Sequence, residues 1–350
     1  MSAAVAAISA PSVVDERDVV IDVRGLSTTF TLGPLESGPD RAGHGGGGVS
    51  LRRRTVEAVK GVSFAVRRGE IFGFLGPNGA GKTTTIKMLT GLIAPTGGEA
   101  FLFGQRVPSP QARQQLGFLP ENPYVYPYLT PREFIELCGR LSGMGGKALR
   151  ARTAEVLALV KITHAADRQV RALSKGMLQR AGLAAALVAD PELLILDEPM
   201  SGLDPVGRKE VKDLMFAERD RGRTIFFSTH ILGDAEAMCD RVAILREGKV
   251  VVSGALRQLL RGEVLGTEVA LGSASPALCE DLTAKGFHLV RRADLVLVEI
   301  EGEARVGELL QAALTAGAQV IEVSRKRETL EDLFLEKALA RAPSAPPPTP

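Results

Sequence analysis

Short apolar runs alternate with helical patterns along the first two thirds of the chain. The runs that indicate strands lie at Val19–Val23, Val62–Val66, Ile71–Leu75, Leu193–Leu196 and Thr224–Ser228. Compact apolar strands are typical of parallel sheets that are covered on both faces. Because strands and helices alternate, the pattern predicts an α/β domain, which we place at residues 18–255.

A mostly helical stretch interrupts this alternation at about residues 109–187. Within it, Thr130-Pro131-Arg132-Glu133 combines an N-cap, a proline at the first helical position and a capping glutamate three residues after the cap. The helix that begins there carries Phe134, Leu137 and Leu141. We therefore expect a helical lobe inserted into the sheet domain.

The pattern begins again after about residue 260. It reads strand, helix, two strands, helix and strand, at 268–271, 276–285, 288–291, 295–300, 304–316 and 320–324. This order predicts a small α+β, ferredoxin-like domain, which we place at residues 260–340. A last amphipathic helix follows, with Leu330, Leu333 and Phe334 at helical spacing.

Three segments lack the pattern of packed structure. We interpret residues 1–17 as a disordered leader and the Pro-rich residues 341–350 as a stiff tail. Residues 33–50 contain four consecutive glycines and form a longer connection than a compact domain normally needs, so we expect a mobile surface insertion. The basic residues 52–54 beside it belong either to a solvated strand face or to a phosphate contact.

Composition narrows the class of protein. The 43 basic and 41 acidic side chains nearly balance, which argues against nucleic acid as the main partner. The cysteines at 138, 239 and 279 are far apart and odd in number, so they indicate neither a disulfide framework nor a zinc site, and a reducing cytosol fits them. The chain contains no run of about 18 apolar residues, so we expect no membrane-spanning helix.

The segment after the run at 71–75 matches the pattern GxxxxGK[ST] at every fixed position. Its residues are Gly76, Pro77, Asn78, Gly79, Ala80, Gly81, Lys82 and Thr83, and Thr84 follows in the helix expected at 83–92. The glycines let backbone N–H groups converge on an anion, Lys82 pairs with the β- and γ-phosphates, and the Thr83 hydroxyl ligates Mg²⁺. A glycine-rich turn that binds nothing has no need of this lysine and threonine. The segment therefore predicts a nucleoside triphosphate site.

Two carboxylates end the apolar strand at 193–196. Asp197 is placed to hold Mg²⁺ through water, and Glu198 is placed to orient or deprotonate the attacking water. The chain contains neither the Asn-Lys-x-Asp motif that reads guanine nor the His-Arg-Asp and Asp-Phe-Gly pair of protein kinases. The sequence therefore favours an ATPase over a GTPase or a kinase.

The segment Leu173-Ser174-Lys175-Gly176-Met177 lies upstream of these carboxylates. At this point the sequence resembles the ATP-binding subunit of an ABC transporter over about residues 19–255. The segment is similar to the family's Leu-Ser-Gly-Gly-Gln signature, with Lys175 and Met177 as departures. The resemblance implies that Ser174 and Gly176 contact the γ-phosphate of a nucleotide held by a second cassette, in a homodimer or a heterodimer. Considered alone, Ser174 is also a suitable N-cap for the helix that follows.

Two further motifs follow in the family's order. Ser201-Gly202-Leu203-Asp204 resembles the D-loop, and Asp204 is expected to lie at the dimer seam beside the nucleotide. Ser228-Thr229-His230 ends a strand as the family's switch histidine does, which implies that His230 contacts the γ-phosphate and helps to hold the catalytic water. The histidines at 44, 164 and 288 have no comparable context, and we assign them no role.

Two positions differ from the family's common pattern. Glu121 stands where the family has the glutamine of its Q-loop, and a carboxylate still serves Mg²⁺, so we expect Glu121 to contact the metal. Phe30 is the only aromatic residue in the stretch where the family places its adenine-stacking side chain. Phe30 is either that stacking residue or an ordinary core residue.

All three tyrosines of the protein, Tyr124, Tyr126 and Tyr128, follow directly after Glu121. Tyrosine is enriched where one end of a side chain packs and the other stays in water, and at binding hot spots. In the resembled family, a groove beside this loop receives a helix of the membrane subunit. We therefore expect the tyrosines to line such a groove; the alternative is that they pack inside the helical lobe.

The resemblance implies a function for the whole chain. It implies a subunit that binds MgATP, hydrolyses ATP and drives separately encoded transmembrane subunits from the cytoplasmic face of the plasma membrane. The end at 328–334 and the Lys-Gly-Met signature resemble bacterial export cassettes, so we expect export, with the C-terminal domain as a dimerising or regulatory element. The alternative is a soluble ABC ATPase in DNA repair or translation, but the paired cassettes and insertions of that class are not visible.

Overall fold

The computed structural model describes residues 18–32, 54–260, 264–292, 294–300, 302 and 304–339. The leader expected at 1–17, the insertion expected at 33–50 and the tail expected at 341–350 lie outside the described residues. The chain divides into two compact units, Met1–Ala255 and Leu256–Pro350, and each is described by itself.

The first unit contains an antiparallel sheet with the strand order β2-β1-β4-β5. Its strands are β1 (Val19–Leu32), β2 (Arg54–Arg67), β4 (Gly97–Leu102) and β5 (Gln105–Arg106). The expected runs at 19–23 and 62–66 lie inside β1 and β2, and the structure extends both strands well beyond the apolar core that identified them.

A second, mixed sheet of the first unit has the order β10-β9-β3-β8-β7-β6. Its strands are β3 (Ile71–Leu75), β6 (Leu116–Leu119), β7 (Leu193–Asp197), β8 (Thr224–Thr229), β9 (Arg241–Arg246) and β10 (Lys249–Ala255). All neighbours pair in parallel except β9 and β10. Because parallel strands end at the same edge, the residues that follow β3, β6, β7 and β8 lie along one edge of the sheet.

Four phenylalanines fill the space between the two sheets. Phe64 of β2 packs on Phe72 and Phe74 of β3 and on Phe226 of β8, with ring centroids 5.1 to 5.7 Å apart. Each side chain is at most 8% exposed. Aromatic pairs of this kind add about 0.5–1.5 kcal/mol each beyond their buried area. The cluster therefore holds β3 and β8 rigidly at the position where their carboxyl ends carry the site.

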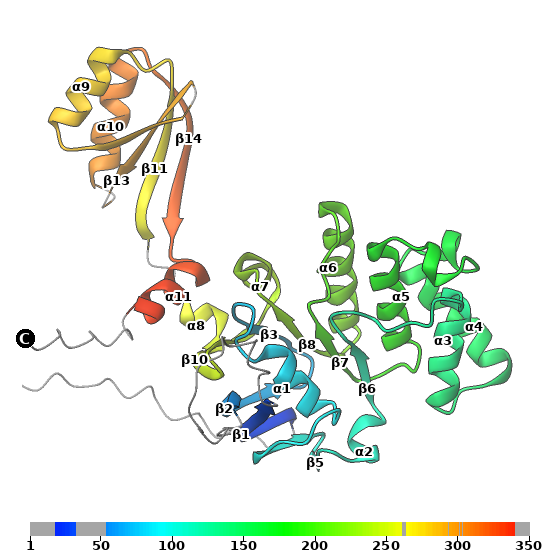
Figure 1. Cartoon of the computed structure of the whole chain (residues 1–350). Helices are drawn as coiled ribbons and strands as arrows, with labels where there is room; N and C mark the ends of the chain where they lie inside the picture. Colours follow the sequence, from blue (N-terminus) through cyan, green and yellow to red (C-terminus); the bar gives the residue numbers. More distant parts are fainter. Residues whose placement is uncertain are drawn as a thin grey trace, which may run out of the picture. The chain divides into compact units, whose positions relative to one another are not determined.

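The helical lobe consists of α3 (Pro131–Leu141), α4 (Gly146–Leu159) and α5 (Lys175–Leu187), which gather beside β6 in Figure 1. The short helix α2 (Pro110–Arg113) and two 3₁₀ turns at Thr163–Ala165 and Val170–Ala172 complete the stretch. The expected start of α3 is confirmed, because the Thr130 hydroxyl accepts from the Glu133 N–H and the Glu133 carboxylate accepts from the Thr130 N–H.

One part of the helical stretch is a strand instead. Leu116–Leu119 forms β6, because its backbone pairs with β7 from Leu116 opposite Leu193 to Leu119 opposite Leu196. The apolar run is too short for its periodicity to separate a buried strand from a helix. As a consequence, the Glu121 loop begins at the carboxyl edge of the sheet.

The helix after the phosphate loop is shorter than expected. It forms α1 (Lys82–Leu89) rather than 83–92. The Thr90 hydroxyl bonds back to the Ile86 carbonyl at 2.9 Å, and Gly91 adopts φ +71°, a left-handed conformation that ends helices. Two more helices of this unit, α6 (Pro205–Asp220) and α7 (Leu232–Met238), follow β7 and β8.

The second unit confirms the expected ferredoxin-like order of elements. They are β11 (Val264–Gly272), α9 (Pro276–Ala284), β12 (His288–Arg292), β13 (Leu295–Ile300), α10 (Ala304–Thr315) and β14 (Gln319–Arg327). The sheet is antiparallel with the order β12-β13-β11-β14, and α9 and α10 cover one of its faces (Figure 1). Its core includes Val269, Leu282 and Leu309. The helix α8 (Leu256–Leu259) precedes this fold and α11 (Leu330–Leu339) follows it.

None of the described helices of either unit has the length and apolar character needed to cross a lipid bilayer.

Candidate functional site

The phosphate loop connects β3 to α1 as the sequence predicted. Pro77, Asn78 and Gly79 are exposed at its tip, while Gly76 and Ala80 are buried at its base. Thr83 and Thr84 are half-buried in the first turn of α1, so the residues expected to hold the phosphates form one continuous segment that ends at Thr84.

Two glycines of the loop have conformations that a side chain would not allow. Gly76 has φ +151°, and a Cβ there would lie 2.4 Å from the Leu245 carbonyl oxygen. Gly81 has φ +106°, and a Cβ there would lie 2.7 Å from the Ala58 carbonyl oxygen. The pattern therefore needs glycine at both positions for steric reasons, because neighbouring backbone presses against the loop from outside.

Lys82 is buried in the centre of this loop with only 6% of its surface exposed. Its Nζ donates to the Gly76 carbonyl at 2.7 Å and lies 3.2 Å from Glu198 Oε1. A buried ammonium needs compensating oxygens, and these two contacts supply them. Phosphate oxygens in the loop would meet the same ammonium group.

The two residues at the end of β7, Asp197 and Glu198, both contact the hydroxyl of Ser228. Ser228, at the end of β8, donates from Oγ to Asp197 Oδ1 at 2.6 Å and accepts from the Glu198 N–H at 2.9 Å. Asp197 and Ser228 are opposite one another in the sheet register. The parallel pairing of β7 and β8 therefore brings the carboxylates and the switch segment together.

The pKa of Asp197 is raised above its ordinary value. Burial of the carboxyl group is the main cause, and the nearby Glu121 carboxylate raises the pKa further. Hydrogen bonds from Ser228 and Thr83 and the charge of Lys82 act in the opposite direction without cancelling the shift. Thr83, Glu121 and Asp197, to which the sequence analysis assigns the metal, therefore lie near one another, and their binding of a metal stays a prediction.

Glu198 lies between the lysine and the switch histidine. Its Oε2 is 3.0 Å from His230 Nδ1, and its Oε1 faces Lys82 without hydrogen-bond geometry, so Oε1 is buried with no hydrogen-bond partner. The His230 side chain is 47% exposed, so it extends from the buried carboxylate toward solvent. A buried carboxylate oxygen with free acceptor capacity beside a partly exposed histidine is arranged to receive a proton from water.

The signature and D-loop residues line a cleft away from the cluster around Lys82. A cleft of about 580 Å³ is lined by both segments, including Ser174, Gly176 and Asp204. No phosphate-loop residue is part of its lining in the described chain. Ser174 is the N-cap of α5 and accepts from the Met177 N–H at 3.2 Å, and Asp204 caps α6 by accepting from the Gly207 N–H at 2.9 Å. Within one chain, these residues are thus separate from the cluster around Lys82.

Phe30 is not a core residue. It lies on β1 opposite Val56 and is 42% exposed. The alternative that it packs in the core is wrong, because its strand extends past the sheet contacts that bury the earlier residues of β1. An adenine-stacking role stays a prediction.

Two buried polar residues complete the site but were not predicted. The Ser228 hydroxyl connects the Asp197 carboxylate to the backbone N–H of Glu198, although the sequence named Ser228 only as part of the switch segment. Gln179 of α5 is 2% exposed, and its amide donates to the carbonyls of Glu198 and Pro199 at 3.4 and 3.3 Å. A polar residue on the apolar side of the α5 helix was the available signal for Gln179.

The three tyrosines lie on the surface. Tyr124, Tyr126 and Tyr128 are 90%, 70% and 73% exposed, so the alternative that they pack inside the helical lobe is wrong. Tyr124 also lines a groove of about 230 Å³ together with residues of β6, α3 and α5, among them Phe118 and Phe134. An exposed aromatic cluster beside an apolar groove is typical of a protein-binding surface.

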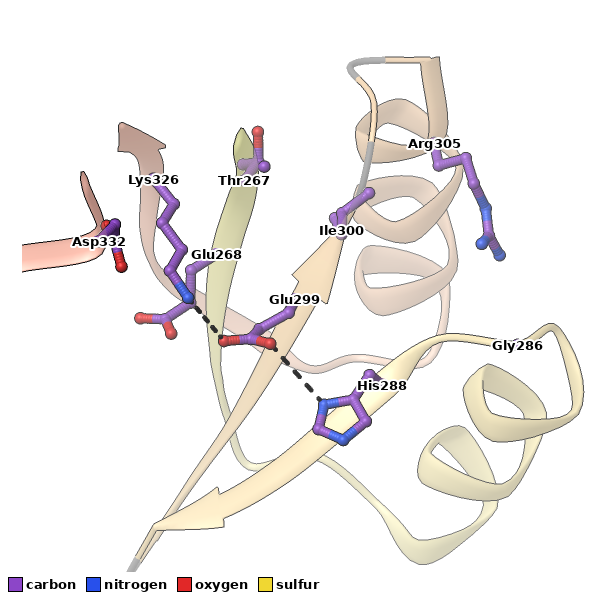
Figure 2. Close-up of a pocket in the computed structure, with 10 residues that line it drawn as sticks. Thr267, Glu268, Gly286, His288, Glu299, Ile300, Arg305, Lys326 and Asp332 are labelled. Carbon is purple, nitrogen blue, oxygen red and sulfur yellow. Dashed lines mark hydrogen bonds and ion pairs between the residues drawn. The ribbon is translucent and has the colours of Figure 1, made fainter. Parts of the chain in front are cut away.

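A second hollow, in the C-terminal unit, is lined by charges of both signs. Its volume is about 610 Å³. Figure 2 shows the residues that line it, among them Glu268, His288 and Glu299 on the strands of this sheet. Glu268 and Glu299 are cross-strand neighbours, and Glu299 lies 3.5 Å from Lys326 Nζ and 3.9 Å from His288 Nδ1. No group of His, Cys, Asp and Glu among the described residues, here or elsewhere, could hold a metal ion by itself.

Comparison with known protein families gives the same assignment as the site. Residues 59–201 match the model of the family described as ABC transporter. An uncharacterized ABC transporter ATP-binding protein of Synechocystis sp. is 42% identical over 289 residues, which cover 82% of this chain and 80% of the relative. The chain belongs to the ATP-binding subunits of ABC transporters. It is therefore an ABC ATPase that binds ATP, and the alternative role in DNA repair or translation has no support.

Other relatives and structures are consistent with this family. The Nod factor export ATP-binding protein I of Burkholderia orbicola is 39% identical over 284 residues, which cover 79% of this chain and 90% of the relative. A solved ATP-binding subunit of an ABC transporter aligns with a TM-score of 0.57 and 31% identity, over 69% of this chain and 92% of that one. A dimeric cassette bound to ADP and Pi aligns with a TM-score of 0.58 and 23% identity, over 68% of this chain and 99% of that one, and shows the same fold.

Proposed function

We propose that two cassettes of this ABC ATPase close around two MgATP, with each nucleotide held between the phosphate loop of one cassette and the signature of the other. One observation carries the proposal: the cleft lined by Ser174 and the D-loop contains no residue of the cluster around Lys82 and Glu198 in one chain. Each group of residues offers only part of the donors that a triphosphate requires. Pairing of cassettes completes both sites at once, in a homodimer or with a related cassette.

In this arrangement each residue has one task. The loop from Gly76 to Gly81 offers backbone N–H groups, Lys82 neutralises the β- and γ-phosphates, and Ser174 and Gly176 approach the γ-phosphate from the opposing cassette. Asp204 helps to shape the seam. Phe30 is exposed on β1 and available to stack on the adenine base.

Hydrolysis is assigned to the pair formed by Glu198 and His230. The water that attacks the γ-phosphate transfers a proton to the Glu198 carboxylate, which lies in a position to accept it. His230 fixes that carboxylate through the 3.0 Å contact with Nδ1 and reaches the γ-phosphate with the rest of its ring. After the γ-phosphate leaves, the contacts that bridge the two cassettes are lost and the dimer opens.

The residues at the end of β7 fit Mg²⁺. Thr83 and Asp197 are in hydrogen-bond contact and Glu121 is close enough to raise the pKa of Asp197, so oxygen ligands converge there. Magnesium usually binds through one or two carboxylates together with substrate phosphates. The described residues contain no group of three His, Cys, Asp or Glu side chains that could hold a metal, which is consistent with this mode of binding. The ion would neutralise charge on the phosphates. Thr83 and Asp197 would hold it, with Glu121 beside them.

The partner is a separately encoded transmembrane subunit, and the transport is export. Support comes from the relative named for Nod factor export and from the exposed tyrosines beside the groove between β6, α3 and α5. An apolar groove with an aromatic rim accepts an amphipathic helix of a partner. Binding to that subunit would hold the cassette at the cytoplasmic face of the membrane, as a peripheral protein.

The nucleotide site is tested by Lys82→Ala, with binding of a fluorescent ATP analogue as the readout. Loss of charge-assisted contacts worth about 1.5–3 kcal/mol lowers the affinity roughly tenfold to a hundredfold. Lys87→Ala, an exposed lysine on the same helix, is the matched control and binds as the wild type does. If Lys82→Ala keeps its fold and still binds ATP normally, the proposed site is wrong.

A further inference from the structure

The signature and the D-loop pack into one another through reciprocal glycines. A Cβ built on Gly202 would lie 2.7 Å from Cδ and Cε of Lys175, so the lysine stem crosses directly over this glycine. A Cβ built on Gly176 would lie 3.2 Å from Cδ2 of Leu203. Each segment therefore contributes one large side chain that rests on the glycine of the other.

Lys175 is also the basic residue of this cleft whose charge is uncompensated. The cleft contains two other long basic side chains, Lys161 and Arg180, and both pair with Glu210 at 3.1 and 2.5 Å. Within the described chain, Lys175 makes no hydrogen bond or ion pair. Its Nζ would lie 3.1 Å from a Cβ on Gly202, so the ammonium stays over the D-loop, where the stem places it.

The ammonium group is thus exposed above the D-loop and has no counter-ion within the described chain. Lys175 follows Ser174 in the sequence and lies over the turn that leads to Asp204. Ser174 and Asp204 both belong to the surface that the proposed pairing of cassettes covers. Burying a charge without a partner is costly, whereas a phosphate oxygen facing it would form a charge-assisted contact. The only triphosphate that this surface meets in the proposed function is the one in the opposing cassette.

We propose that Lys175 binds the γ-phosphate of the nucleotide held by the opposing cassette. The aliphatic stem of Lys175 packs on Gly202 of the D-loop, and this contact positions the side chain. This inference rests on the proposed two-cassette function and adds a cation to the contacts of Ser174 and Gly176. The lysine stabilises the closed dimer with ATP more than with ADP, because only ATP presents the γ-phosphate.

The test compares Lys175→Met, Lys175→Arg and the control Lys147→Met in the full-length Glu198→Gln chain. Methionine keeps an unbranched stem over Gly202 but removes the charge, and Lys147 is an exposed lysine of α4 with no contact to the cleft. Light scattering gives the ATP concentration at which half of the protein is dimeric. A fluorescent nucleotide measures ATP binding to the single chain, and thermal unfolding monitors the fold.

We expect Lys175→Met to raise the half-saturating ATP concentration for dimerisation about tenfold, the effect of one lost charge-assisted contact. ATP binding to the single chain and the unfolding temperature stay unchanged. Lys175→Arg and Lys147→Met dimerise as the parent does. Added salt weakens dimerisation of the parent more than that of Lys175→Met, because salt screens the phosphate contact.

Three results overturn the inference, and they differ in whether the proposed function survives. If the parent dimerises with ATP and Lys175→Met does so at the same concentration, Lys175 has no phosphate contact while the proposed function survives. If Lys175→Met loses thermal stability and single-chain ATP binding together, Lys175 serves packing alone. A parent that binds ATP and never dimerises removes the proposed function itself, and this inference with it.

Discussion

At the residue scale, the site depends on how the Glu198 carboxylate is held. Glu198 has φ +49°, a left-handed conformation that costs a non-glycine residue about 1–2 kcal/mol. Hydrogen bonds on both sides of the residue maintain it: Ser228 accepts from its N–H, and Gln179 donates to its carbonyl. The turn therefore directs the carboxylate toward Lys82 and His230 at the expense of local strain.

We predict that Glu198→Gln slows ATP hydrolysis by about 10²–10⁴-fold, because the amide no longer accepts a proton from water. ATP binding stays intact, since the amide keeps the shape of the side chain. Release of inorganic phosphate measures the rate. Glu247→Gln, an exposed glutamate that belongs to neither half of the proposed site, serves as the control. An unchanged turnover in Glu198→Gln would exclude Glu198 as the base.

The raised pKa of Asp197 predicts a pH dependence of stability. The carboxyl group has an ordinary pKa of 3.8 when unfolded, and burial raises the pKa in the folded, nucleotide-free protein. The folded state thus binds the proton more tightly, so this group's contribution to stability is complete below the unfolded pKa and is lost as pH rises through the folded pKa.

We therefore compare the free energy of unfolding of Asp197→Asn with that of the wild type. As pH rises from the unfolded pKa of Asp197 to its folded pKa, we expect the difference to shift in favour of Asp197→Asn, and above the folded pKa we expect it to stay constant. Urea unfolding of both chains without nucleotide, from acidic to neutral pH, measures the difference. Ser253→Ala, on the exposed surface of β10, should show no such trend. A difference between Asp197→Asn and wild type that does not change with pH contradicts the assigned cause.

At the element scale, the connection from β6 to α3 carries residues of two proposed sites. It begins with Glu121 at the nucleotide edge of the sheet and continues through the three exposed tyrosines to the capped start of α3. Tyr128 also carries a cation–π contact, since Arg171 lies 5.7 Å from its ring centre. Under the proposed function, this connection would link the nucleotide to a partner bound at the groove.

We predict that replacing Tyr126 and Tyr128 by alanine uncouples the cassette from its membrane subunit. Removal of two aromatic anchors costs about 2 kcal/mol or more of binding energy, while ATP affinity of the free chain stays as it was. The readout is the ATPase rate with and without the co-purified membrane subunit. Leu141→Ala, an equally exposed residue of α3 outside the groove, is the control. Loss of ATP binding in the tyrosine variant would count against the assignment.

Some helices and strands could be predicted from the sequence, and others could not. The capping box at Thr130 and the order of the C-terminal elements were predictable, because both depend on residues close in sequence. Strand β6 was not predictable, because Leu116–Leu119 is a strand only through its backbone pairing with β7, which is distant in the sequence. The end of α1 at Leu89 depends on the hydroxyl of Thr90 and the left-handed Gly91, which a pattern of apolar positions does not reveal.

The site shows the same division. Lys82, Asp197 and Glu198 were predicted because their motifs are contiguous and the chemistry requires those residue types. Ser228 and Gln179 act through contacts with residues 31 and 19 positions away, so only the folded chain reveals their roles. The exposure of Phe30 and of the tyrosines likewise depends on which faces of the fold are covered.

At the scale of the whole molecule, the second unit has a core of its own, and under the proposed function the first unit carries two incomplete halves of a nucleotide site. A nearly complete switch between open and closed pairs needs about 5.5 kcal/mol of differential affinity. Charge-assisted contacts to the γ-phosphate from Lys82, His230 and the opposing signature are of the right size, at about 1.5–3 kcal/mol each.

The most direct test of this account is the molar mass of the full-length Glu198→Gln chain in solution with ATP and Mg²⁺, measured by light scattering. We predict a dimer with ATP, a monomer with ADP, and a monomer with ATP when Lys82→Ala or Ser174→Ala is added. A chain that binds ATP and remains monomeric, or one that is equally dimeric with and without nucleotide, would contradict the claim that each nucleotide is shared between two cassettes.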